Sequence, residues 1–292
     1  MVNVNSLTPG DHRRTLHVDE RERYYLFHLP AAKMPADGWP VVLAFHGGGS
    51  SPPGMIEFCG LNEKSESAGF VVVYPAGTGR FPHALTFNGG NCCGHAQRHA
   101  IDDGKFVAAI LDDLPQAFPV DTRRIYSTGM SNGGILSYWI ADQLATRIAA
   151  IAPVGGPMGT ASCAPARGVS VLHIHGTDDE FAPFRGGRGA RSLTQTDFYS
   201  VDHSIQAWVK ANACGPVPQV EQLPPLVADG THLTRATYSG GRDGSEVILY
   251  TIRGGGHTWP GRPSKYAFLG KTSENLNAND VMWEFFQRHP LA

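Results

Sequence analysis

The chain has 292 residues, of which 41% are hydrophobic, and its 24 Lys and Arg residues nearly balance 26 Asp and Glu residues, giving a net charge of -2. Because the charge is near zero and no run of Lys or Arg occurs, there is no electrostatic reason to expect a nucleic acid or an anionic membrane as partner. The longest apolar stretches, such as Phe70–Tyr74 and Ile148–Val154, are too short to span a membrane. Glycine and proline together make up about one residue in five, which is typical of a globular chain rich in turns.

Buried strands and intervening helices are predicted along most of the chain, because continuous apolar, β-branched runs alternate with segments of helical spacing. The predicted strands are Arg23–Leu29, Val41–Phe45, Phe70–Tyr74, Arg124–Ser127, Ala149–Val154, Val169–Ile174 and Glu246–Ile252. The predicted helices are Met55–Ala68, Phe106–Leu114 (capped by Asp102 or Asp103), Gly133–Leu144, Ser204–Asn212 and Asn279–Arg288. This alternation predicts a mostly parallel sheet with helices on both faces, so we expect residues 1–292 to form one three-layer α/β domain with little or no lid. Residues 215–244 are polar and rich in Pro and Gly, and they are expected to form a surface excursion.

Five cysteines and the first residues of the chain bear on its cellular compartment. The cysteines are Cys59, Cys92, Cys93, Cys163 and Cys214, an odd number without zinc-ribbon spacing, and buried thiols with at most one structural bridge are expected. The first residues contain no apolar segment of the kind found in signal peptides. Read as it stands, the sequence predicts a cytoplasmic protein, whereas the mature form of a secreted protein would begin in the same way.

The segment Gly129-Met130-Ser131-Asn132-Gly133 lies between a predicted strand and a predicted helix. This G-x-S-x-G pattern in that position is typical of a nucleophile elbow, a tight turn that exposes the serine hydroxyl at the carboxyl edge of the sheet. The alternative is an ordinary helix-capping serine. The position between strand and helix favours Ser131 as a nucleophile, with the backbone N–H of Asn132 available to an oxyanion.

Two further loops follow predicted strands and supply the remaining parts of a serine hydrolase. A glycine run, 47–49, comes directly after Val41–Phe45 and lets the backbone approach a tetrahedral oxyanion closely. His257 follows Glu246–Ile252 and lies among glycines in a loop, which is an unusual position for a packing residue. It is predicted to take the proton of the serine.

Three acidic residues compete for the third position of the triad. Asp178, Asp179 and Glu180 follow Val169–Ile174, and the chain order Ser, acid, His suits all three. The spacing before Ala182 and Pro183 favours Asp179. No metal-binding motif occurs, and hydrolysis by this triad needs no cofactor. His173 and His175 alternate on one strand face without a third ligand, so they are expected to be structural.

These motifs together resemble those of α/β-hydrolases, and more narrowly the bacterial poly(3-hydroxybutyrate) depolymerase and feruloyl esterase group of carbohydrate esterase family 1. The resemblance extends over about residues 21–290. The matching stretches are VVLAFHGGGSS, AGFVVVYPAGTG, the Cys92-Cys93-Gly94 turn with Ile101-Asp102-Asp103, RRIYSTGMSNGG, IAAIAPVGG, HIHGTDDEFAP, GGGHTWPG and VMWEFFQRHP. Relatives commonly differ after Asp103 and have Val-Pro-Tyr in place of Ala182–Phe184, and these departures leave the triad motifs intact.

The resemblance implies roles for further residues. In such families the residue that follows His-Gly donates the first oxyanion N–H, which carries over to Gly48, with Gly49 as the competing choice. The tryptophan two residues after the histidine often lines the substrate pocket, which implies a substrate contact for Trp259. The aspartate of the HGT-x-D loop corresponds to Asp179.

We therefore expect a serine carboxylic-ester hydrolase that acts on a small-molecule or polymeric ester through Ser131, His257 and Asp179 and an acyl-enzyme intermediate. Feruloyl or short hydroxyalkanoate esters are favoured, and an acetyl xylan or other short-chain esterase is the alternative. A serine peptidase and an inactive binding protein on the same fold are the other hypotheses. The sequence does not choose among the esters and does not indicate an oligomeric state.

Overall fold

A computed structural model of the chain describes residues 7–192 and 194–292, and its centre is a ten-stranded sheet. The strand order is β1-β2-β4-β3-β5-β6-β7-β12-β11-β10. The central strands β4, β3, β5, β6, β7 and β12 run parallel to one another. At one edge β1 and β2, and at the other edge β11 and β10, pair antiparallel with their neighbours. These strands are Gly10–Val18 (β1), Arg21–Leu29 (β2), Trp39–Phe45 (β3), Val71–Pro75 (β4), Val120–Met130 (β5), Ala150–Val154 (β6), Ser170–Gly176 (β7), Gln219–Leu223 (β10), His232–Tyr238 (β11) and Val247–Arg253 (β12). The α/β fold class predicted from the alternating pattern is confirmed.

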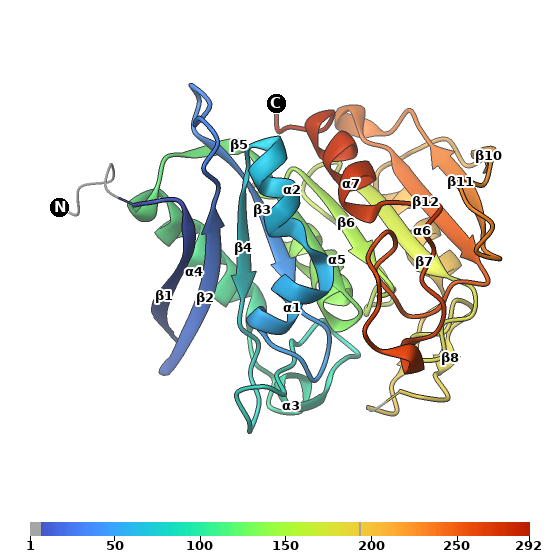
Figure 1. Cartoon of the computed structure of the whole chain (residues 1–292), viewed down its shortest axis with the longest axis horizontal. Coiled ribbons are helices and arrows are strands. Elements are labelled where there is room, and N and C mark those ends of the chain that lie inside the picture. Colours follow the sequence, from blue (N-terminus) through green and yellow to red (C-terminus); the bar gives the residue numbers. More distant parts are fainter. Residues whose placement is uncertain (1–6, 193) are drawn as a thin grey trace.

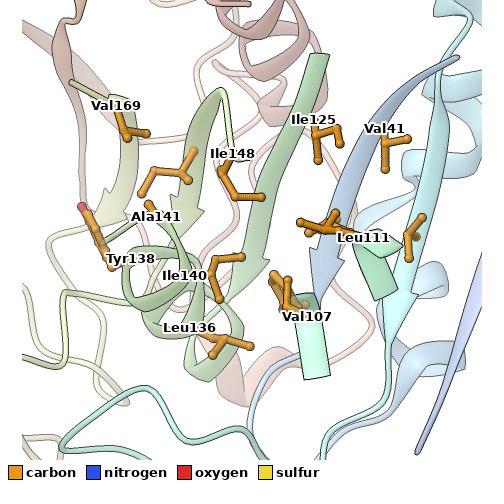
Figure 2. Close-up of a cluster of buried hydrophobic side chains, with 14 of the residues drawn as sticks. Val41, Val107, Leu111, Ile125, Leu136, Tyr138, Ile140, Ala141, Ile148 and Val169 are labelled. Carbon is orange, nitrogen blue, oxygen red and sulfur yellow. The ribbon is translucent and has the colours of Figure 1, made fainter. Parts of the chain in front are cut away.

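Helices cover both faces of the sheet, with α1, α2 and α7 in front in Figure 1 and α4, α5 and α6 behind. The helices are Pro52–Cys59 (α1), Leu61–Ala68 (α2), Gly94–Arg98 (α3), Asp103–Ala117 (α4), Asn132–Gln143 (α5), Val201–Ala211 (α6) and Ala278–Gln287 (α7). Alternate side chains of β3 enter different cores: Leu43 packs in the cluster that Figure 2 shows beneath α4 and α5, and Ala44 packs in the cluster beneath α1, α2 and α7. Burial on both faces explains why this strand is apolar without alternation.

Residues 215–244 were expected to be a surface excursion, and this expectation is wrong. They contain β10 and β11, which extend the sheet beyond β12. The residues of β10 are exposed apart from the half-buried Leu223, so the strand carries no apolar pattern that would predict it. The edge strand β1 was not predicted for the same reason, since its side chains alternate between half-buried and exposed apart from the buried Val18 at its end.

The single helix expected over Met55–Ala68 is two helices, α1 and α2. Gly60 separates them with φ 61° and ψ 28°, a left-handed conformation that ends the first helix. The cap expected for α4 is Asp102, whose side chain accepts a hydrogen bond from the N–H of Lys105 at 2.8 Å. Cys92 and Cys93 form a disulfide with each other. In the part of the chain described, no helix has the length and apolar character needed to cross a membrane.

Candidate active site

Ser131 occupies the turn between β5 and α5 at the carboxyl edge of the sheet. Its φ of 54° and ψ of -118° lie in a region that residues other than glycine rarely adopt. The N–H of Ser131 donates to the carbonyl oxygen of Val154 at 2.8 Å, which ties the turn to β6. A strained turn of this kind holds a side chain away from the sheet, as in a nucleophile elbow.

Glycines are required beside this turn because backbone segments approach one another there. A Cβ at Gly133 would lie 2.2 Å from the carbonyl oxygen of Phe45, and a Cβ at Gly129 would lie 2.5 Å from the carbonyl carbon of Gly133. Any larger residue would push α5 away from β3. The G-x-S-x-G spacing is therefore a consequence of how closely strand and helix pack.

Asp179 and His257 lie on loops that follow the neighbouring parallel strands β7 and β12. Nδ1 of His257 lies 2.6 Å from Oδ2 of Asp179. The second carboxylate oxygen, Oδ1, accepts the backbone N–H groups of Phe181 and Ala182, both at 2.8 Å. Since a carboxylate accepts, Nδ1 of His257 carries the proton and Nε2 is left as the basic nitrogen.

The other two acidic residues of this loop do not reach His257. Asp178 and Glu180 are exposed, and Glu180 pairs with Arg191 at 2.6 Å. Burial of Asp179 opposes its ionisation, but the charge of His257 and hydrogen bonds from neighbouring histidines outweigh burial and hold the pKa of Asp179 well below its usual value. Asp179 is therefore ionised at neutral pH and can stabilise an imidazolium at His257.

His46, at the end of β3, holds the glycine run in place. It is fully buried, with Nδ1 2.8 Å from the carbonyl oxygen of Gly47 and Nε2 accepting the N–H of Gly77 at 3.0 Å. Because an N–H can only donate, Nε2 is the acceptor and Nδ1 donates to Gly47. Burial lowers the pKa of His46 to about 4, so the ring is neutral at pH 7.

The anchored carbonyl of Gly47 determines where the N–H of Gly48 points. In a trans peptide the N–H lies opposite the C=O, so the Gly48 N–H points away from His46. A Cβ at Gly48 would lie 3.6 Å from Cβ of Asn132, which places this peptide beside the residue that follows Ser131. The N–H of Gly49 is donated to the carbonyl oxygen of Leu85 at 2.9 Å, whereas that of Gly48 has no acceptor within residues 7–192 and 194–292.

The side chain of Asn132 is held by the backbone of Phe87, which fixes the position of this residue and of its backbone N–H. Oδ1 accepts the N–H of Phe87 at 2.7 Å, and Nδ2 donates to the carbonyl oxygen of the same residue at 2.9 Å. Asn132 is the first residue of α5, where backbone N–H groups lack partners within the helix. The N–H groups of Gly48 and Asn132 are thus two neighbouring donors that an oxyanion can use.

A cavity of about 820 Å³ opens over these groups, a size typical of small-molecule sites. Ser131, His257, Gly48, Gly49 and Asn132 all line it. Its aromatic lining comprises Phe58, Phe81, Phe181, Phe198, Tyr266 and Phe268. Among the described residues that line it, Arg80 and Arg98 are the charged side chains other than histidine, and no carboxylate is present. The described residues contain no group of three or more His, Cys, Asp or Glu arranged to hold a metal.

Comparisons with known proteins agree with this chemistry. No protein-family model matches the chain. The putative esterase NocK of Nocardia uniformis subsp. tsuyamanensis is 29% identical over 97% of this chain and 87% of its own length. Feruloyl esterase B of Piromyces equi is 30% identical over 60% of this chain, which spans 32% of that protein. The bifunctional acetylxylan esterase/xylanase XynS20E of Neocallimastix patriciarum is 30% identical over 56% of this chain and 22% of its own length.

Two solved structures share the fold. The acetyl xylan esterase from Aspergillus awamori superposes with a TM-score of 0.60 at 14% identity, covering 94% of this chain and 99% of that one. The structure of native sOPH superposes with a TM-score of 0.61 at 13% identity, covering 99% and 90%. The protein is a carboxylic ester hydrolase with the α/β-hydrolase fold. It resembles the depolymerase and feruloyl esterase group of carbohydrate esterase family 1.

The esterase does not bring Trp259 to the cavity. This tryptophan is 1% exposed and packs in the core beneath α7, and its indole N–H donates to Oδ1 of Asn279 at 2.9 Å. The family resemblance implied a substrate contact at this position, and the structure instead places an indole that links the His257 loop to α7. What marks Trp259 as a core residue and not a substrate contact is its hydrogen bond to Asn279, and a partner 20 residues away cannot be read from the local motif.

The esterase also contains site residues that the sequence did not single out. His46 orients the peptide that carries the Gly48 N–H, and a histidine that ends a strand gives no hint of this. His175, expected to be structural, lies behind the triad, with Nε2 2.8 Å from the carbonyl oxygen of Ala182 and 3.3 Å from Oδ2 of Asp179. Phe181, Ser192, Thr194 and Phe198, which lie between β7 and α6, also line the cavity, and none of them was predicted to be a site residue.

Proposed function

We propose that Ser131, His257 and Asp179 hydrolyse carboxylic esters through an acyl-enzyme. Ser131 attacks the ester carbonyl while Nε2 of His257 accepts its proton, and Asp179 fixes the tautomer and stabilises the imidazolium. The oxyanion is held by the N–H groups of Gly48 and Asn132. His257 then protonates the leaving alkoxide, and water hydrolyses the acyl-serine by the same steps in reverse.

The observation that carries this proposal is the 2.6 Å contact between His257 and Asp179 at a cavity that Ser131 also lines. Because this contact holds a proton on Nδ1, Nε2 is the nitrogen available to accept the proton of Ser131. The strained backbone of Ser131 and the two neighbouring N–H donors add independent support.

We further propose that the substrates are esters of short or aromatic acyl groups. The names of the feruloyl and acetylxylan esterase relatives and the aromatic lining of the cavity support this class. A panel of methyl ferulate, acetylated xylan, hydroxybutyrate oligomers and p-nitrophenyl acetate distinguishes among them by kcat/KM.

A fluorophosphonate probe tests the nucleophile directly. Intact-mass measurement is expected to show one adduct on the wild-type protein and on Ser192→Ala, a serine that lines the same cavity, and no adduct on Ser131→Ala. A folded wild-type protein that forms no adduct, or an adduct that persists in Ser131→Ala, would contradict the assignment.

A further inference from the structure

Three aromatic rings lead away from His257 toward solvent, and we refer to Phe181, Phe268 and Tyr266 as the aromatic row. The ring of Phe181 stacks on that of His257, with centroids 5.1 Å apart and planes at 25°. Phe181 lies 6.2 Å from Phe268, which in turn lies 5.6 Å from Tyr266. The row is therefore continuous from the proposed general base to the rim of the cavity, and all three residues line that cavity.

The outer rings of the row are exposed to an extent that folding does not require. Phe268 is 55% exposed and Tyr266 is 49% exposed, although burying either ring would stabilise the protein. The backbone beneath them is held firmly. The Leu269 carbonyl accepts the N–H of His257 at 2.7 Å, and the Phe268 carbonyl accepts a hydrogen bond from Arg191 at 3.2 Å. A surface of exposed rings on an anchored segment is typical of a binding site.

The position of the row relative to His257 indicates which part of the ester it contacts. A general acid must lie next to the atom that it protonates, and in ester hydrolysis this atom is the oxygen of the leaving alcohol. Groups beyond His257 on that side therefore contact the alcohol and not the acyl chain. We propose that the aromatic row is a subsite for an alcohol that bears a ring with an apolar face, either a sugar ring or an aryl ring. This inference rests on the proposed function and adds to it the recognition of the alcohol.

The test varies the alcohol while the acyl group stays acetyl. Ethyl acetate, benzyl acetate and a monoacetylated methyl xyloside are compared on the wild-type protein, Tyr266→Ala and Phe268→Ala, with Leu226→Ala as a control for loss of an exposed apolar side chain outside the cavity. Each row variant is expected to lower kcat/KM for the ring-bearing alcohols about 3- to 10-fold, mainly through KM, and to leave ethyl acetate within about 2-fold. A loss confined to one of the two ring alcohols identifies it as the ligand.

A second series varies the acyl group and keeps methanol as the alcohol, using methyl acetate and methyl ferulate. The proposal expects equal effects of the row variants on both esters. A selective loss with methyl ferulate would place the row on the acyl side and overturn the proposal, and so would unchanged kcat/KM for every ester. If the wild-type protein cleaves none of these esters, it is the proposed function that fails.

A different observation concerns a buried line of polar groups behind the triad, formed by Tyr138, His173 and His175. The hydroxyl of Tyr138 lies 2.8 Å from Nδ1 of His173, and Nε2 of His173 lies 3.0 Å from Nδ1 of His175. All three residues are at most 1% exposed. Burial and the neighbouring His175 lower the pKa of His173 well below its usual value, so this ring is neutral.

The direction of the hydrogen bonds in this line is determined at its inner end. The carbonyl of Ala182 can only accept, so Nε2 of His175 carries a proton. With that proton on Nε2, Nδ1 of His175 is the nitrogen that can accept from His173, and His173 in turn can accept from the Tyr138 hydroxyl. The same Nε2–H lies 3.3 Å from Oδ2 of Asp179, the oxygen that binds His257.

We infer that His175 is a positioning residue, which holds Asp179 and the Ala182 peptide so that the carboxylate faces His257. The test compares His175→Leu, which removes the donor, with His175→Gln, whose amide N–H can take the place of Nε2. Ile205→Ala serves as a control for loss of core packing. His175→Leu is expected to lower kcat at least about 10-fold with KM within about 2-fold, and His175→Gln to recover most of it.

A purely structural role gives a different pattern. His175→Leu would then lower the melting temperature as Ile205→Ala does, while kcat of the folded fraction would stay at the wild-type value. Equal losses of kcat in the Leu and Gln variants would also overturn the inference, because restoring the donor would then have no effect.

Discussion

Nδ1 of His46 donates a hydrogen bond to the carbonyl oxygen of Gly47 at 2.8 Å, and together with the longer bond from the N–H of Ser50 at 3.2 Å it orients the peptide that ends in the Gly48 N–H. The imidazole is fixed from its other side by the N–H of Gly77. A buried, neutral histidine thus connects the loop after β4 to the glycine run after β3. In the proposed mechanism, the preorganisation of the Gly48 N–H as an oxyanion donor therefore depends on a side chain that does not line the cavity.

Replacing His46 by Phe should keep the volume of the ring and remove both hydrogen bonds. We expect kcat to fall about 10-fold or more, with a small change in KM, because the peptide that carries the Gly48 N–H keeps only the longer hydrogen bond from Ser50. The free energy of unfolding should fall by about 1–3 kcal/mol, since the N–H of Gly77 is left without a partner. Steady-state kinetics and urea unfolding on the same samples separate the two effects, and an unchanged kcat in a folded variant would show that another contact orients the peptide.

Burial of His46 also predicts a dependence of stability on acid. Its pKa is lowered to about 4 in the folded state, whereas the unfolded chain binds a proton near pH 6.5. The unfolded state therefore binds more protons below pH 6.5, so the stability contributed by the neutral ring is lost as the pH falls from about 6.5 toward 4. At pH 5 the protonation of this one residue should lower the free energy of unfolding by about 2 kcal/mol. Urea unfolding of the wild-type protein should therefore show a drop in this free energy between pH 7.5 and pH 5 that is about 2 kcal/mol larger than the drop in His46→Phe. An equal difference in both proteins would contradict the assigned burial effect.

The parallel strands and the helices that cover them could be predicted because each buries a face with a clear apolar pattern. Leu43 and Ala44, which enter opposite cores, produce the continuous apolar run that identifies β3. The edge strands could not be predicted, because Val220 on β10 is 60% exposed and its neighbours are polar. What holds β10 in place is backbone pairing with β11, and side-chain patterns do not record such pairing.

Asp179→Asn should lower kcat far more than Asp178→Asn. The amide cannot accept the Nδ1 proton of His257 as a carboxylate does, so the ring can adopt the tautomer that leaves no base facing Ser131. We expect a loss of about 10³- to 10⁴-fold for Asp179→Asn. The change for Asp178→Asn should stay within about 2-fold, because the side chain of Asp178 is exposed and, among the described residues, accepts a hydrogen bond only from Thr177. Comparable losses in the two variants would refute the assignment of Asp179.

The elbow glycines offer a test on stability that is independent of substrate. Gly133→Ala should destabilise the protein by about 3 kcal/mol or more, because the new Cβ would lie 2.2 Å from the carbonyl oxygen of Phe45, and backbone cannot move away cheaply. Gly48→Ala is the matched control, since its Cβ would meet its nearest neighbour, Cβ of Asn132, at 3.6 Å. Thermal unfolding of both variants gives the comparison, and a Gly133→Ala protein as stable as Gly48→Ala would show that strand and helix are less tightly packed.

The motifs that carry the proposed site could be located from the sequence because each lies directly after a strand. Local motifs cannot reveal partners that are distant in the chain. His175 was identified as a strand residue, and its contact with Asp179 depends on how the loop after β7 folds back. Trp259 shows the opposite case: the family resemblance implied that it contacts the substrate, whereas it is a core residue that donates a hydrogen bond to Asn279.

An ion pair between Arg23 and Asp103 supports the backbone segment that fixes the side chain of Asn132, whose N–H is proposed to bind the oxyanion. Nη2 of Arg23 lies 2.7 Å from Oδ1 of Asp103, and both side chains are at most 4% exposed. Oδ2 of Asp103 accepts the N–H of Asn88 at 2.7 Å, and Asn88 follows Phe87, whose backbone brackets the side chain of Asn132. Loss of the carboxylate should therefore weaken the fold and loosen the segment that fixes Asn132.

Asp103→Asn leaves the guanidinium of Arg23 buried without a countercharge, and we expect the free energy of unfolding to fall by about 3–5 kcal/mol. The double variant Arg23→Met with Asp103→Leu removes both charges and should recover part of this loss, because the penalty comes from the unpaired charge and not from the missing pair. Urea unfolding of Arg23→Met, Asp103→Leu and the double variant measures the coupling between the two side chains. If the double variant is as unstable as the sum of these two single variants, the two side chains act independently and the ion pair does not stabilise the fold.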